Sequence, residues 1–273
     1  MKQPGQTRDG SGGKTVRKPY LTGTIADENT VRNSLKIFGT LIIVFFVTFI
    51  ACATATFSNI ILRVLLNAAV VAVTLLIFYN NGAGYGADAV ARGEILYQKQ
   101  ERGQSFSSSE RKICFHPMKG FLTGLIGTMP LLILALILAC GTSLQMTGAG
   151  TLPSWMQVYT RRSDIGNALV NYTNPEAMRF IDYIRAFVRF CILPYINIAG
   201  YTNKYAVFVL EKISPVLFLL PAASYGTGYM TGRKIRTRIH TAISENERKR
   251  AKRERKRRSR MSGRRRNEPE QLN

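Results

Sequence analysis

Long runs of apolar residues alternate with polar, basic segments along the 273 residues of this chain. A helix of about 20 apolar residues crosses the roughly 30 Å hydrocarbon core of a bilayer. Four runs reach this length, and they predict membrane spans at residues 35–57, 60–79, 120–140 and 213–232. The pattern therefore predicts an all-α integral membrane protein. Its core would be a four-helix transmembrane bundle, within one polytopic membrane domain over residues 35–232.

The first two runs are separated only by Ser58 and Asn59, which predicts a tight helical hairpin. The first run also contains Ala-x-Ala spacing at residues 51–53, a feature of cleaved signal peptides. The basic segment before it is long, and the run exceeds an ordinary signal-peptide core. We therefore expect this helix to be retained.

The segments outside the apolar runs are polar and basic. Residues 1–34 are rich in glycine and lysine or arginine, which predicts a disordered basic tail. Residues 80–119 form a polar connection. Its opening, Asn-Asn-Gly-Ala-Gly-Tyr-Gly at 80–86, predicts a turn, and residues 87–102 predict an amphipathic helix. Residues 141–174 are a second polar connection.

Residues 176–192 are amphipathic rather than uniformly apolar. At helical spacing, four charged residues share one face of this segment: Arg179, Asp182, Arg185 and Arg189. One interpretation is an interfacial or re-entrant helix, with its charges in water and lipid headgroups. The other is a polar stripe at membrane depth, lining an aqueous path or binding an anion. On either interpretation, Asp182 is spaced to neutralise Arg179 and Arg185.

The distribution of charge decides between four and five spans. Residues 233–266 carry 17 Lys/Arg and 3 Glu, a net charge of +14 out of +22 for the chain. With four spans, both tails and the 80–119 connection, all basic, lie in the cytoplasm, as the positive-inside rule predicts. With five spans, residues 176–192 cross the membrane and two basic segments lie outside. We expect four spans, cytoplasmic N- and C-termini, and a bacterial cytoplasmic membrane as the location.

Small residues recur every four positions near the ends of two spans. They form one ladder at Gly120 and Gly124, and another at Ser224, Gly228 and Gly232. Such spacing allows helix backbones to approach closely. In the four-span topology both ladders lie at the same depth on antiparallel helices, so we expect them to pack against each other.

The C-terminal tail, residues 233–273, is also predicted to be largely disordered, and it contains a dense basic cluster. Isoleucines at 235, 239 and 243 predict a short amphipathic helix over residues 233–243 that continues from the last span. Ser-Glu-Asn-Glu at 244–247 predicts the start of a second, highly charged helix. The cluster would bind anionic lipids at the cytoplasmic face, or RNA or the ribosome through phosphates. Its members are Arg248, Lys249, Arg250, Lys252, Arg253, Arg255, Lys256, Arg257, Arg258 and Arg260.

No enzyme signature occurs in the sequence: there is no P-loop, no His-Glu-x-x-His and no Cys-x-x-Cys. His116 and His240 have no evident nucleophile or metal partner, and Asp88 and Glu94 have no special spacing. We assign no catalytic, cofactor-binding or metal-binding residue. We expect a non-enzymatic scaffold or accessory subunit that contacts lipids and other membrane subunits. The alternatives are a transporter or channel subunit with the Arg/Asp stripe as an anion path, and a membrane-tethered RNA- or ribosome-binding factor.

Overall fold

The computed structural model describes residues 16–54, 59–144, 156, 158–159, 162, 164, 179–200 and 203–266, without side chains at 54 and 259–266. Several sequence predictions fall on other residues: part of the first tail, residues 55–57 of the first span, most of the 141–174 connection, residues 176–178, the Arg260 side chain and residues 267–273. Within the described part all regular structure is helical. The helices are α1 (Glu28–Thr54), α2 (Ile60–Glu101), α3 (Ser108–Lys112), α4 (Lys119–Gly141), α7 (Phe180–Cys191), α8 (Leu193–Ala199) and α9 (Lys204–Arg266).

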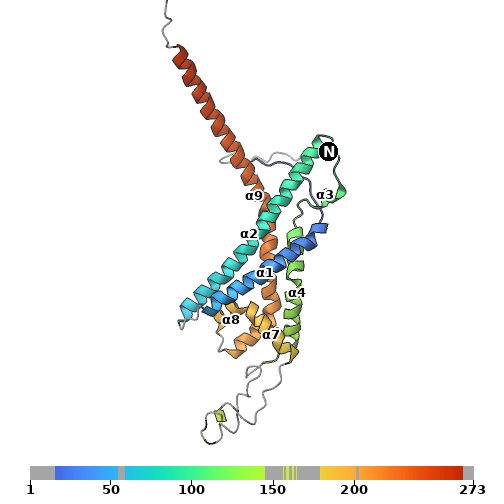
Figure 1. Ribbon diagram of the computed structural model, residues 1–273, viewed down its shortest axis with the longest axis vertical. Helices are drawn as coiled ribbons and strands as arrows, with labels where there is room; N and C mark the ends of the chain where they lie inside the picture. The colour runs from blue at the N-terminus through green and yellow to red at the C-terminus, as the bar shows by residue number, and fades with distance from the viewer. Residues whose placement is uncertain are drawn as a thin grey trace, which may run out of the picture.

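Four of these helices, α1, α2, α4 and α9, are long and apolar enough to cross a membrane. They form an elongated bundle (Figure 1), with α9 in contact with both α2 and α4. The short helices α7 and α8 lie at one end, beside the start of α9 and the end of α4. At the other end, which we call the basic end, α2 and α9 project beyond α1 and α4.

The core of the bundle is aromatic and aliphatic. Phe45 of α1 and Phe218 of α9 pack edge to face, with ring centroids 5.8 Å apart. Leu138 of α4 and Val188 of α7 belong to the same buried cluster and are fully enclosed. The apolar face of α7 therefore packs into the bundle, which joins the short helices to the long ones.

The predicted turn at residues 80–86 is wrong, because α2 runs through it without a break. Its glycines serve close packing. A β-carbon added at Gly82 or Gly86 would meet the backbone carbonyl of Tyr225 or Tyr229, respectively, on α9. Glycine at these positions lets two helix backbones approach closely, which outweighs its low intrinsic helix propensity. The expected separate helix at 87–102 is the continuation of α2.

The two ladders of small residues do not pack against each other as predicted. Gly120 and Gly124 do face α9, but they contact Tyr229 and Ala222. The ladder on α9 faces α2 instead. The Ser224 hydroxyl donates to the Leu75 carbonyl at 2.7 Å, Gly228 lies against Tyr79, and Gly232 lies against Gly86. Helix α9 thus presents separate faces to α4 and α2, a choice that the spacing of small residues alone does not encode.

The expectation of a disordered N-terminal tail is wrong for residues 16–34. An extended segment precedes α1 and lies on the basic end, where the Leu21 amide donates to the Gly93 carbonyl at 3.1 Å. Helix α1 begins at Glu28, seven residues before the predicted start. The Thr30 hydroxyl donates to the Asp27 carboxylate at 2.6 Å, and the buried Lys119 ammonium lies 3.0 Å from the same carboxylate. These bonds fix the first turns of α1 and α4 to each other.

Candidate functional site

The charged stripe of α7 lies against the bundle rather than in solvent. Asp182 and Arg185 are buried, and Arg185 Nη1 lies 3.2 Å from Asp182 Oδ1. The Arg179 side chain is exposed, and Arg179 contacts Asp182 through its backbone amide, at 3.0 Å from Oδ2. Asp182 therefore neutralises Arg185, as expected. The interpretation of α7 as a helix with all its charges in water and headgroups is wrong for this pair.

The partner that completes this cluster is Glu211 of α9, whose side chain is only 2% exposed. Its carboxylate accepts from Arg189 Nε at 2.6 Å and from the Thr142 hydroxyl at 2.7 Å. Arg185 Nη2 donates to the same hydroxyl at 2.6 Å, while Arg185 Nε lies 3.3 Å from Glu211 Oε2 without hydrogen-bonding geometry. We call these five residues (Thr142, Asp182, Arg185, Arg189 and Glu211) the α7 network.

Two carboxylates and two guanidinium groups make the α7 network neutral. Buried charges are tolerated when they are paired and hydrogen-bonded, and the network meets that condition between α4, α7 and α9. Glu211 was not identified from the sequence, although a single carboxylate directly before the last apolar run was a readable signal. Because its positive charges already have carboxylate partners, the network offers little attraction to an added anion.

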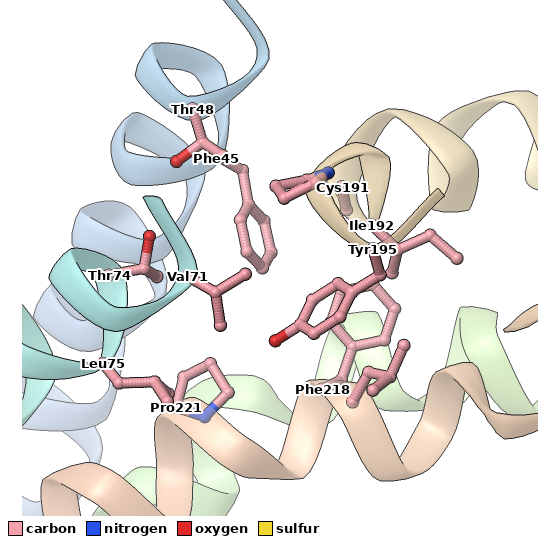
Figure 2. A pocket seen from close by; sticks show the side chains of 12 residues that line it. Phe45, Thr48, Val71, Thr74, Leu75, Cys191, Ile192, Tyr195, Phe218 and Pro221 are labelled. Atoms are coloured by element: carbon pink, nitrogen blue, oxygen red, sulfur yellow. The ribbon is translucent and has the colours of Figure 1, made fainter. Parts of the chain in front are cut away.

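A partly open pocket lies beside this end of the bundle, between α1, α2, the α7–α8 pair and α9 (Figure 2). Twelve residues line it, and none of them is charged. The Tyr195 ring reaches from α8 towards Val71 and Pro221, and Thr48 and Thr74 supply hydroxyl groups. An apolar pocket of this kind does not continue the α7 network into an anion path across the bundle.

The basic end carries a second buried cluster, which ties α9 to α2. Glu94 is 5% exposed and lies at a multiple of four residues from Gly82 and Gly86 along α2. Its carboxylate accepts from Arg236 Nε at 2.9 Å and lies 2.8 Å from His240 Nε2. We call Glu94, Arg236 and His240 the α2–α9 clamp. No partner for His240 was evident from the sequence. The four-residue spacing that relates Glu94 to Gly82 and Gly86 was the signal for its burial.

The N-terminal segment reinforces the α2–α9 clamp. The Val16 amide donates to the Thr241 hydroxyl at 3.2 Å. The Tyr20 ring packs edge to face on Phe115. The Arg233 guanidinium lies over the Tyr20 ring, 5.6 Å from the ring centre. Helix α2 and the N-terminal segment therefore both hold α9 in one direction as far as residue 241.

Beyond the clamp, α9 continues as one helix to Arg266. The predicted helix over residues 233–243, continuing from the last span, is therefore confirmed. The predicted disorder of the tail and the separate helix start at residue 244 are wrong up to residue 266. We call residues 248–266 the basic arm. The predicted polybasic residues up to Arg258 are all exposed, and Figure 1 shows this part of α9 projecting away from the bundle. The arm contains 13 Lys/Arg and one carboxylate, Glu254, so its net charge is +12.

The described residues contain no group of three or more His, Cys, Asp or Glu that could hold a metal ion. The buried Cys114 lies between α3 and α4, where its thiol donates to the Glu110 carbonyl at 3.6 Å. Burial raises the pKa of the Cys114 thiol, and the nearby Lys119 opposes this shift only in part. A protonated, enclosed thiol is a poor nucleophile.

No protein-family model matches the chain, and neither does any curated protein or solved structure.

Proposed function

We propose that this protein is a non-enzymatic membrane scaffold or accessory subunit that holds the basic arm away from the bilayer for a polyanionic partner. The continuity of α9 carries the proposal, because one helix joins the apolar bundle to the exposed arm. The α2–α9 clamp supports it by fixing the direction in which the arm leaves the bundle. Anionic lipids, other membrane subunits and nucleic acids are the partner classes that the charge admits.

The charge pattern supports a bacterial cytoplasmic membrane, with the basic end in the cytoplasm. Helix α7, with 12 residues, is about 18 Å long, which is too short for the roughly 30 Å hydrocarbon core. This length fits the four-span topology, in which α7 and α8 are interfacial or re-entrant helices at the face of the membrane opposite the basic end. Single cysteines at Ser109 and Asp164, in a background without native cysteines, test this topology. An impermeant reagent should label only position 164 in intact cells, and labelling of only position 109 would contradict it.

A transporter that uses the Arg/Asp stripe as an anion path has less support. Its charges are neutralised within the α7 network, and the adjoining pocket has no charged lining residue. The exposed arm is the larger unbalanced charge, and it lies outside the bundle. Charge available for recognition is therefore concentrated in the arm.

Retention on immobilised heparin, a soluble polyanion, tests the scaffold proposal. The full chain in detergent should elute at clearly higher salt than a variant ending after Ser244. Both proteins should unfold at the same temperature, since the arm lies outside the bundle. Equal elution of the two proteins would contradict the proposal.

A further inference from the structure

We propose that the basic arm binds the phosphate backbone of nucleic acid, without sequence preference. This inference rests on the proposed function and names the partner class of the same helix. Three properties of the arm carry it: its charge density, its distance from the bundle and its lack of an apolar face.

The charge density of the arm is comparable to that of a nucleic acid. Residues 248–266 span about 27 Å as a helix and hold 13 Lys/Arg. Duplex DNA carries one negative charge per about 1.7 Å of its axis, or roughly 16 over the same length. Since the arm's basic residues surround the helix, about half can face one duplex at a time, giving an estimate of about six phosphate contacts.

The position of the arm disfavours binding to the lipids of its own membrane. The apolar part of α9 ends at Gly232, beside Gly86. Arg248 lies 16 residues further along the same helix, a distance of about 24 Å. Charge interactions are screened over about 8 Å at physiological ionic strength, so attraction to an anionic leaflet falls to roughly a twentieth over that distance. Bending the helix back would require the α2–α9 clamp or the helix itself to break.

The composition of the arm also disfavours insertion into a bilayer interface. Helices that lie in the interface bury an apolar face. Between Ser244 and Arg266 the apolar side chains are Ala251 and Met261 only. This stretch has no aromatic residue to stack on bases, and Asn246 is its single amide side chain. Recognition would therefore depend on phosphate charge and not on base identity.

The test uses the full chain in nanodiscs of uncharged lipid and a fluorescent 12-base-pair duplex, in RNA and DNA forms and in two unrelated sequences. Anisotropy titrations at several salt concentrations give the dissociation constant and its salt slope. One variant combines Arg250→Gln, Arg253→Gln and Arg257→Gln. The matched control removes three exposed charges near the bundle by Arg102→Gln, Lys234→Gln and Arg238→Gln.

We expect both sequences to bind alike and the salt slope to be about −5. The arm variant should lower the magnitude of that slope by two to three and weaken binding at least tenfold at 100 mM salt. The control should change binding about twofold or less. Equal weakening by the two variants would overturn the inference.

A second outcome would assign the arm to lipid. If replacing the uncharged lipid of the nanodisc with anionic lipid abolishes duplex binding, the arm lies on the membrane and the nucleic-acid inference fails. Retention on heparin without duplex binding would also overturn the nucleic-acid inference, while the proposed scaffold function would stand. Absence of both heparin retention and duplex binding would contradict both proposals.

Discussion

The α7 network and the basic arm use the same side chain, arginine, with opposite results. In the network, Arg185 and Arg189 each lie against Glu211, and the charges sum to zero in a largely buried site. In the arm, 13 basic residues share one carboxylate, and those up to Arg258 lie exposed. Positive charge that is neutralised by carboxylates stabilises packing between helices, whereas unbalanced exposed charge remains available to a partner. The comparison separates the part of the molecule that holds it together from the part that we expect to bind.

The largest expected effect is Glu211→Gln, which removes the acceptor shared by two arginines. The variant leaves Asp182 as the one carboxylate for two arginines, so the buried network carries a net positive charge, which should cost about 3–5 kcal/mol of folding free energy. Thermal unfolding in detergent measures the loss. Arg189→Gln is the control: its side chain is 40% exposed, so the cost should be under about 1 kcal/mol. Equal losses for the two variants would contradict the account of the network.

The next effect concerns the glycine packing between α2 and α9. Gly86→Leu should lower stability by about 3 kcal/mol, since the side chain would meet the Tyr229 backbone. Gly84→Ala is the matched control on the exposed face, where an added β-carbon meets no atom within 4 Å. It should be neutral or stabilise by up to about 1 kcal/mol through helix propensity. A tolerated Gly86→Leu would refute close packing at this position.

A smaller effect is expected at the α2–α9 clamp. Glu94→Gln weakens the acceptor for Arg236 and His240 and should cost about 1–3 kcal/mol. Hydrogen exchange of amides 233–243 should accelerate, while exchange in α4 stays unchanged. Glu110→Gln serves as the control, because its ion pair with Lys99 is exposed and worth less than about 1 kcal/mol. Unchanged exchange in the Glu94 variant would show that the clamp does not hold α9.

The smallest effect is a pH dependence at Cys114. Because burial raises its thiol pKa above the ordinary 9.0, the folded state keeps a proton that the unfolded state loses. Folding stability is therefore independent of this thiol well below about pH 9, and it falls as pH rises from the unfolded pKa towards the higher folded pKa. With the other cysteines replaced, maleimide should modify Cys114 at pH 7.5 at least tenfold more slowly than an added cysteine at exposed Ser108. Equal rates would contradict its burial.

The sequence predicted the apolar helices well, because length and hydropathy are local properties. Helix α2 shows the limit of that approach. Residues 80–86 have the composition of a turn, yet Gly82 and Gly86 are helical because α9 packs on them. The sequence also did not show which charged residues pair with each other. Glu211 lies 26 residues beyond Arg185 in the chain, and Glu94 lies 146 residues from His240, so only the packed bundle brings these groups together.

The central claim is that α9 carries its basic arm away from the bilayer as one helix. Pulsed electron paramagnetic resonance tests it directly, in nanodiscs and in a background without native cysteines. One spin label is fixed at Arg102 and a second is moved through positions 246, 250, 254 and 258. The account predicts narrow distance distributions that lengthen by up to about 6 Å per step. Broad distributions that do not lengthen along this series would contradict it.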